Sequence, residues 1–151
     1  AGHDTTAFAL AVGLYFLCKN PEIQEKARQE ALAVFGKPGA DKRVPITHEQ
    51  LKQIPFIESI IKEAMRYYPS VSRLPSRINQ VELEVNGITI PKNQILTLEM
   101  IHFSRSAKYW ENPDEFDPYR FYNTTTKDMK HSFAWSTFGG GQRLCIGKDF
   151  S

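Results

Sequence analysis

The chain has 151 residues, of which 41% are hydrophobic and 24% are charged, a composition typical of a globular domain that is long enough to bury a core. Its 19 Lys and Arg residues against 17 Asp and Glu residues give a net charge of +2, which argues against nucleic acid as a partner and against strong attraction to anionic lipid. Its 2 cysteines are too few for a disulfide framework and favour a reducing compartment.

The N-terminal segment predicts a buried helix. Residues 3–18 are apolar on nearly every face, so we expect this helix to be buried on all sides, with Cys18 as a small hydrophobic residue. Its most apolar run, AFALAVGLYFLC, is shorter than the roughly 20 residues of a membrane span. The chain has no initiator Met and ends in GKDFS, which is typical of the first turn of another helix, so we expect a piece of a longer protein.

A second helix is predicted over residues 21–35. Pro21 suits its first turn, and Gly36 is expected to end it. Glu22 and Lys26 have the i,i+4 spacing of a surface ion pair.

Two further helices follow a charged Pro/Gly loop at residues 37–45. ITHEQL starts the first of them, with a capping box formed by Thr47 and Gln50. The second runs over residues 55–67 and has one apolar stripe at helical spacing. The stripe consists of Ile57, Ile60, Ile61, Ala64, Met65 and Tyr68.

The period of the pattern then changes from helix to strand. VELEV (81–85) alternates, ITI (88–90) returns, and the Asn-Gly pair at 86–87 is a type I′ turn signal, which together predict a β-hairpin. QILTL (94–98) predicts another strand. Residues 105–137 are rich in aromatic residues and have little periodicity, and a connection of this length is expected to be functional or packed against another element.

Near the C-terminus, FGGGQRLCIG (138–147) surrounds a lone thiol, Cys145, with backbone that carries few side chains. A disulfide with Cys18 is disfavoured because that residue is expected inside a buried helix. A zinc site needs further Cys or His ligands close by, and none is present near Cys145. A phosphate-binding loop fails because the spacing to the Gly-Lys pair is wrong and Asp149 replaces the Ser or Thr that holds magnesium.

The remaining chemical interpretation is a metal ion held by one thiolate on the face of a flat ligand. Glycines let the backbone approach a planar macrocycle, and the positive end of a helix starting after Cys145 favours the thiolate. Arg143 can reach an acidic substituent of the same ligand. A haem iron with an axial cysteine thiolate meets these conditions. The alternative is a glycine-rich surface turn with a free thiol.

This loop resembles the cysteine-ligand loop of the cytochrome P-450 enzymes, Phe-x-x-Gly-x-Arg-x-Cys-x-Gly. The matching, cofactor-binding positions are Phe138, Gly141, Arg143, Cys145 and Gly147. By this resemblance Cys145 is the axial ligand of the iron in haem b (iron protoporphyrin IX), and Arg143 holds a haem propionate. Thr137 departs from the proline that many members have, which leaves the ligand intact.

The first residues, AGHDTT, resemble the oxygen-activation segment of the family's long central helix. The resemblance implies that Gly2 leaves room beside bound dioxygen and that Thr5 and Asp4 deliver protons. A proton relay needs a hydroxyl or carboxylate near the oxygen, so the chemistry is reasonable. The alternative is a polar helix start at which Asp4 and Thr5 serve as caps.

The sequence EAMR matches the family's Glu-x-x-Arg. On a helical wheel Glu63 and Arg66 face away from the apolar stripe, which by itself predicts a solvated pair. The resemblance instead implies a buried, structural ion network that includes Arg120 of FDPYRF (116–121). Tyr119 stands where the family usually has glutamate, a departure that puts a detail of this network in doubt.

Arg77 stands where the family often has a second propionate-binding arginine, with Arg73 as its competitor and a surface arginine as the alternative. RSAKYW resembles the family's stretch before the aromatic loop, with departures at Ser104, Ser106 and Ala107. We predict no functional partner for the histidines, which are His3, His48, His102 and His131.

The resemblance covers the whole chain. It implies a mainly α fold with a small β region, a partial cytochrome P-450 fold in which residues 1–151 are a single partial domain and the N-terminal half is missing. The implied enzyme is a haem-thiolate monooxygenase that inserts one oxygen atom from dioxygen into a small apolar organic substrate. Its electrons would come from an NADPH-dependent reductase or a ferredoxin.

The location and two alternatives also follow from the resemblance. A membrane attachment would lie in the missing N-terminal half, at the cytosolic face of the endoplasmic reticulum membrane; a full chain without an anchor would be cytoplasmic. The alternatives are a non-catalytic truncated fragment and a haem-thiolate peroxide isomerase that needs no reductase. Such isomerases tend to depart at the oxygen-activation threonine, and Thr5 is present.

Overall fold

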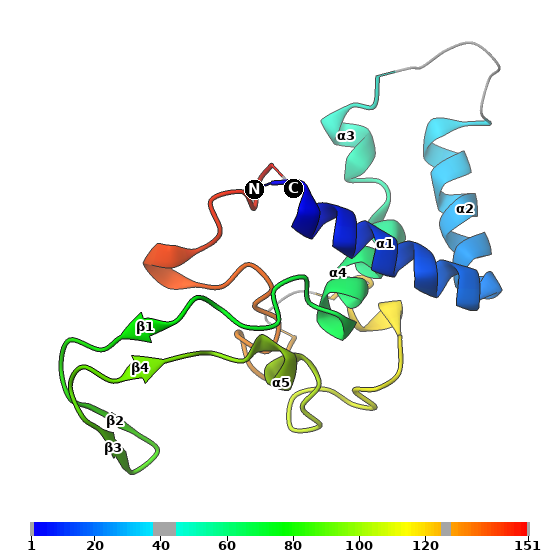
Figure 1. Cartoon of the computed structure of the whole chain (residues 1–151). Coiled ribbons are helices and arrows are strands. Elements are labelled where there is room, and N and C mark those ends of the chain that lie inside the picture. The colour runs from blue at the N-terminus through cyan, green and yellow to red at the C-terminus, as the bar shows by residue number, and fades with distance from the viewer. Residues whose placement is uncertain (1, 38–44, 125–127, 151) are drawn as a thin grey trace.

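The computed structural model of the chain describes residues 2–37, 45–124 and 128–150, so most of the loop predicted at 37–45 lies outside it. Helices form the N-terminal half, paired short strands lie to one side, and the C-terminal third consists mostly of turns (Figure 1). The prediction of a mainly α fold with a small β region is confirmed.

The core lies where three helices meet. Helix α1 (Asp4–Lys19) packs against α4 (Pro55–Tyr67), and α2 (Pro21–Phe35) packs against both. Side chains from all three helices form two apolar clusters: Val12, Phe16 and Ala64 in one, and Ile23, Ala27, Phe56 and Ile60 in the other. Each large side chain buried in this way contributes about 1.5–3 kcal/mol, so these contacts hold α4 in place.

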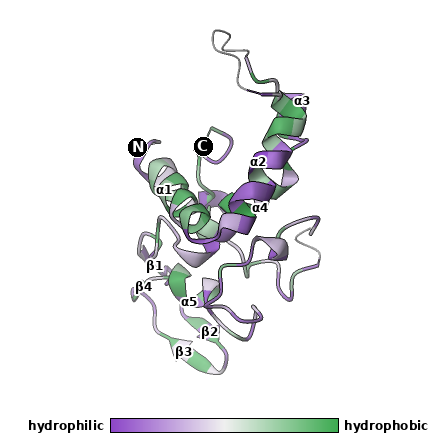
Figure 2. Cartoon of the chain, turned by 90° about the vertical axis from the view of Figure 1, so that its right-hand side faces the viewer, coloured by the Kyte–Doolittle hydropathy of each residue, from purple (hydrophilic) through white to green (hydrophobic). Residues whose placement is uncertain are grey.

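The expectation that the first helix is buried on all sides is wrong for this chain. The buried residues of α1 fall on one face, whereas Phe8 and Leu14 are 46% and 62% exposed, and Cys18 is exposed as well. The helix is mostly apolar between its polar ends (Figure 2), but α2 and α4 cover only one side of it. An apolar pattern shows that a face can be buried; a second element is needed to bury it.

The local start and stop signals of the helices are confirmed. Pro21 occupies the first turn of α2, and Gly36 ends it with a φ of 76°, a conformation that favours glycine. Helix α3 (His48–Leu51) begins with the predicted capping box: the Thr47 side chain accepts from the Gln50 amide, and the Gln50 side chain accepts from the Thr47 amide.

The predicted surface pair between Glu22 and Lys26 is absent among the described interactions, because Lys26 reaches elsewhere. Its Nζ lies 4.1 Å, 4.3 Å and 4.6 Å from the ring centroids of Phe56, Tyr119 and Tyr122. It also lies 3.2 Å from the Tyr119 hydroxyl, to which it donates. A cation surrounded by aromatic rings gains more than an exposed ion pair in water. Lys26 therefore ties α2 to the aromatic stretch near the C-terminus.

The predicted hairpin forms, with β2 (Leu83–Val85) antiparallel to β3 (Ile88–Ile90). The Asn86 and Gly87 φ angles of 51° and 79° are those of a type I′ turn. The strand expected at 94–98 is shorter, β4 (Ile95–Leu96), and it pairs with β1 (Arg77–Ile78), a strand that the pattern did not predict.

The aromatic stretch at 105–137 packs against the helices. It follows α5 (Met100–Ser104), a short helix that was not predicted, and contains the 3-10 turn η1 (Pro118–Arg120), which contacts α4. Its own apolar cluster consists of Trp110, Phe121 and Ala134, with Tyr109, Met129 and Trp135 against it. In the part of the chain that the structure describes, every helix is too short or too polar to cross a bilayer.

Candidate functional site

The loop around Cys145 is closed by its own backbone. The Cys145 amide donates to the Phe138 carbonyl over 2.9 Å, and the 3-10 turn η2 (Gly141–Arg143) lies between them. Gly139 and Gly141 have φ angles of 76° and 64°, a left-handed conformation that side chains disfavour. Glycine is thus required at these two positions by the path of the backbone itself.

Glycine at position 140 has a different cause. A Cβ there would lie 2.9 Å from the Phe133 ring, which packs over the loop. At Gly141 a Cβ would meet nothing within 4 Å, so that position is open, and at Gly147 it would lie 3.9 Å from the Cys145 sulfur, an ordinary contact. The glycines therefore serve the backbone conformation and the Phe133 contact.

The helix expected to start after Cys145 is absent from the described residues. The backbone after Cys145 forms turns, with the amides of Lys148 and Phe150 donating to the carbonyls of Cys145 and Gly147. The expected helix terminus is therefore not found beside the thiol in the described residues.

The surroundings of the thiol fit a flat apolar group. Cys145 is exposed, and so are Leu144 before it and Ile146 after it, the latter completely. Among the described residues no cluster of three or more His, Cys, Asp or Glu side chains could hold a metal ion. The iron of a haem brings most of its ligands with it, so a single thiolate such as that of Cys145 is enough to hold it.

The candidate propionate-binding arginines lie on separate segments. Arg143 is exposed in η2, and Arg77 is exposed in β1, and neither has an ion-pair partner among the described residues. The competitor Arg73 is engaged: its Nε lies 2.6 Å from a carboxylate oxygen of Glu99. The occupied guanidinium of Arg73 leaves Arg77 as the better candidate of the two.

The predicted oxygen-activation residues lie at the start of α1. The Asp4 carboxylate is 89% exposed and lies 2.7 Å from Nδ1 of His3, a partner that the sequence reasoning did not supply. Neither Asp4 nor Thr5 caps the helix, because the N-cap position is His3 and no side chain makes a capping bond there. The alternative interpretation of these residues as caps is therefore wrong.

The Thr5 backbone connects this helix start to the end of α4. Its carbonyl accepts a hydrogen bond of 2.9 Å from the Ser70 hydroxyl. In both views the start of α1 lies in the same part of the molecule as the last described residues of the Cys145 loop (Figures 1 and 2). Segments from the two ends of the sequence thus share one region of the fold.

The structure brings Glu63, Arg66 and Arg120 together. Nε and Nη2 of Arg66 donate to the two Glu63 oxygens over 2.7 Å and 2.8 Å, and both side chains have no exposed surface. The Asp117 amide donates to Glu63 over 2.9 Å, and Arg120 Nε lies 3.4 Å from the same carboxylate. The solvated pair that the helical wheel predicted is therefore wrong, because the polar face of α4 is covered.

The cover is irregular backbone from the aromatic stretch. Arg66 donates to the carbonyls of Ser104, Pro113 and Glu115, over 2.7 Å, 2.8 Å and 3.0 Å. Burial raises the pKa of the Glu63 carboxyl above its usual value, while the bonds from Arg66 act in the opposite direction. One guanidinium thus satisfies carbonyls that the turns of this stretch leave without a backbone donor.

Arg120 binds two further carbonyls of this stretch. Its terminal nitrogens donate to the carbonyls of Glu111 and Asn112, the latter over 2.8 Å. Tyr119 faces Lys26 instead of the ion network, so its departure from the family's usual glutamate leaves the Glu63 contacts in place.

Two connections were missed by the sequence reasoning. Glu30 of α2 accepts the amides of Phe56 and Ile57, each over 2.9 Å, and so caps α4 from another helix. Trp135 donates from Nε1 to the Lys62 carbonyl of α4 over 3.2 Å. Partners more than twenty residues apart leave no signal in a local pattern, so only the folded chain reveals them.

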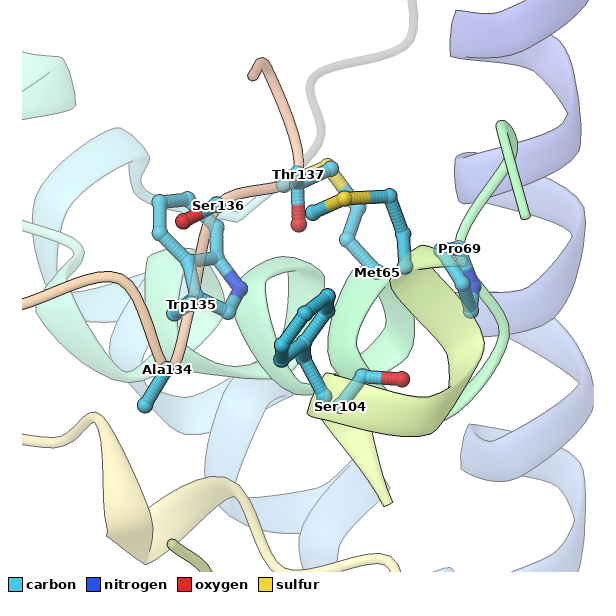
Figure 3. A pocket seen from close by; sticks show the side chains of 9 residues that line it. Met65, Pro69, Ser104, Ala134, Trp135, Ser136 and Thr137 are labelled. Carbon is cyan, nitrogen blue, oxygen red and sulfur yellow. The ribbon is translucent and has the colours of Figure 1, made fainter. Parts of the chain in front are cut away.

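A small pocket lies between α4, α5 and the segment that leads into the loop. It is lined by Met65, Pro69, Met100, Phe103, Ser104 and residues 134–137. Figure 3 shows Trp135, Ser136 and Thr137 on one side of it and Met65 and Pro69 on another. The pocket therefore lies where residues 134–137, which lead into the Cys145 loop, approach α4.

Comparisons with known proteins agree with this arrangement. The sequence model of the family Cytochrome P450 matches residues 1–151. Cytochrome P450 3A13 of Mus musculus is 32% identical over 100% of this chain, and taurochenodeoxycholic 6 alpha-hydroxylase of Sus scrofa is 36% identical over 100%. The chain covers 29% and 28% of these two relatives, so it spans less than a third of their length.

A solved structure shows the same fold. A zebra fish cytochrome P450, determined with progesterone, superposes with a TM-score of 0.82 at 24% identity. The match covers 99% of this chain and 32% of that one.

Proposed function

Because the chain belongs to the cytochrome P450 family, we propose that it is the C-terminal part of a haem-thiolate monooxygenase. The observation that carries this proposal is the exposed thiol of Cys145 in a loop of glycines that is closed by the Cys145 amide. In the complete protein one atom of dioxygen would enter a small apolar organic substrate, and the other would leave as water. The reaction takes two protons, and its two electrons would come from an NADPH-dependent reductase or a ferredoxin.

The loop is the proposed binding site for haem b. When bound, a haem held by a thiolate would supply the activation of dioxygen, because electron donation from sulfur favours O–O cleavage. Cys145 would hold the iron through Sγ, and the backbone of Phe138, Gly141 and Gly147 would lie against the haem. Arg143 and Arg77, which are exposed, would donate charge-assisted hydrogen bonds to the propionates.

The start of α1 is the proposed proton route. Asp4 is exposed and can take a proton from solvent at its carboxylate. The Thr5 hydroxyl, one residue further into the helix, would hold this proton next in the route. Gly2, two residues before Asp4, would leave space beside these groups.

Glu63, Arg66 and Arg120 have a structural role in this proposal. Their contacts to the carbonyls at 104–115 hold the aromatic stretch on α4, and none of the three is needed for the chemistry. For the location we propose the cytosolic face of the endoplasmic reticulum membrane, with attachment through a segment of the longer protein outside this sequence, or the cytoplasm if there is no such segment.

The test is incorporation of labelled oxygen by the full-length gene product. With NADPH, a reductase and ¹⁸O₂, we expect one ¹⁸O atom in the product from an apolar substrate and no incorporation from labelled water. The substrate panel should include taurochenodeoxycholate, because the relative at 36% identity is named for its hydroxylation. A Cys145→Ala variant, expressed in parallel, should give no labelled product.

Two results would contradict the proposal. Turnover of a peroxide without NADPH and without ¹⁸O uptake would indicate the isomerase. A folded product that takes up no haem would indicate a non-catalytic fragment.

A further inference from the structure

Trp135 contacts three parts of the molecule: α4, the aromatic stretch and the Cys145 loop. Its indole Nε1 donates to the Lys62 carbonyl of α4 over 3.2 Å, next to Glu63 in sequence. Its ring packs edge-on against that of Phe121, the residue that follows Arg120 in the sequence, with the ring centroids 5.8 Å apart. It also meets Phe138, the first residue of the Cys145 loop, edge-on at 6.3 Å.

The Cys145 loop is otherwise held largely by itself. The backbone bonds within it run from Gly139 to Ser136, from Leu144 to Gly141 and from Cys145 to Phe138. These bonds fix the shape of the loop, but they do not fix where the loop lies on the rest of the protein. Apolar contacts at Gly140 and in the pocket beside Met65 place the loop in part. The indole bond to α4 adds a directional link three residues before Phe138, whose carbonyl accepts the Cys145 amide.

We propose that Trp135 is a positioning residue for the thiolate: it fixes the Cys145 loop on α4 and thereby sets where the sulfur lies. This inference rests on the proposed function only where it concerns the metal ligand. The link between Trp135 and the loop is a property of the chain itself.

The chain offers a closely matched control in Trp110. It belongs to the same apolar cluster and donates from Nε1 to the Phe103 carbonyl, also over 3.2 Å. Its ring lies 5.6 Å from that of Phe121, and the Arg66 guanidinium lies 5.5 Å from its centre. Trp110 is therefore at least as well connected to the core, but no described contact joins it to Phe138. If the effect on the loop came only from a general loss of stability, a Trp110 variant should therefore show it at least as strongly as a Trp135 variant.

The experiment compares Trp135→Phe and Trp110→Phe in the full-length gene product. The absorption of the reduced, carbon-monoxide-bound form separates thiolate-ligated protein from protein with a neutral ligand. One lost hydrogen bond should shift the ratio of the two forms toward neutral ligation by about fivefold in Trp135→Phe. In Trp110→Phe the ratio of thiolate-ligated to neutral-ligated protein should stay at the wild-type value, even if the thermal midpoint of this variant falls as much as that of Trp135→Phe.

Hydrogen exchange of the same proteins supplies a readout that does not require haem. The Cys145 amide, which bonds to Phe138, should exchange about fivefold faster in Trp135→Phe, while the amides of the hairpin at 83–90 exchange as in the wild type. In Trp110→Phe the Cys145 amide should be unaffected.

The outcomes separate this inference from the proposed function. Equal loss of thiolate ligation and equally fast exchange at Cys145 in both variants would show that Trp135 acts only through core stability, and would overturn the inference. Wild-type ligation and wild-type exchange in both variants would overturn it as well. If the wild type itself shows no thiolate band, the proposed function fails, and faster exchange at Cys145 in Trp135→Phe alone would still support the link.

Discussion

Arg66 is the residue on which the packing of α4 against the aromatic stretch depends most. Its side chain has no exposed surface, and it donates two hydrogen bonds to Glu63 and three to the carbonyls of Ser104, Pro113 and Glu115. The substitution Arg66→Met keeps a side chain of similar length and apolar stem but removes every donor. It leaves the Glu63 carboxylate buried with Arg120 and the Asp117 amide as its partners.

The expected cost follows from these contacts. Removing one partner of a buried ion pair costs about 3–5 kcal/mol, because the remaining charge loses its compensation. Each buried carbonyl that loses its donor adds about 1–3 kcal/mol, less where water can reach it. The sum exceeds about 5 kcal/mol, which is the lower end of the total stability of a natural domain. We therefore expect Arg66→Met to remove most or all of the stability.

A matched control is the exposed pair of Glu25 and Arg28, which has the same i,i+3 spacing and a distance of 2.7 Å. Arg28→Met should leave the free energy of unfolding almost unchanged, because exposed pairs contribute little. The assay is urea unfolding of the full-length gene product, together with its soluble yield. An Arg66→Met protein that unfolds within about 1 kcal/mol of Arg28→Met would refute the reasoning from burial.

Three smaller predictions use the same protein. Lys26→Met should lower the free energy of unfolding by about 1–2 kcal/mol through the lost ring contacts; an unchanged urea midpoint would contradict this. Glu30→Gln should cost about 1 kcal/mol in the same assay, because the charged cap of α4 is lost; a cost equal to that of the surface variant Glu22→Gln would argue against the cap. The hydrogen bond from Arg28 lowers the pKa of the exposed Glu25 carboxyl below 4.5, so the small stability from this pair is present above pH 4.5 and lost as the pH falls through the lowered pKa. In an NMR titration Arg28→Met should raise this pKa toward 4.5, and an unchanged pKa would contradict the assignment.

The sequence predicts best the features whose cause is local. The turn at Asn86 and Gly87 and the capping box of Thr47 each depend on residues within four positions, and both form as expected. The closing bond of the Cys145 loop to Phe138 is local as well, but it was not predicted, and the helix expected after Cys145 does not form in the described residues.

The predictions that failed concern side chains whose surroundings are formed by segments far away in the sequence. The wheel places Glu63 on a polar face of α4 correctly, but it cannot reveal that irregular backbone covers that face and supplies carbonyls to Arg66. Lys26 was assigned to a neighbour on its own helix, and it instead reaches Tyr119, 93 positions away. The resemblance to the family predicted that Glu63 and Arg66 are buried, whereas the helical periodicity predicted that they are exposed to solvent.

The residues that connect the site to the helices carried no sequence signal. Trp135 and Glu30 each bond to backbone atoms of α4, and any residue type offers such atoms. A pattern of side chains therefore cannot identify the partner. Strand β1, only two residues long, was missed for a similar reason, since its pairing with β4 is its main cause.

The central claim is that Cys145 binds a haem iron through its sulfur. It is tested most directly by the absorption spectrum of the reduced, carbon-monoxide-bound full-length protein, recorded beside Cys145→Ala. We predict the red-shifted Soret band of thiolate ligation in the wild type and its absence in the variant. The same spectrum in both proteins, or a wild type that folds without taking up haem, would contradict it.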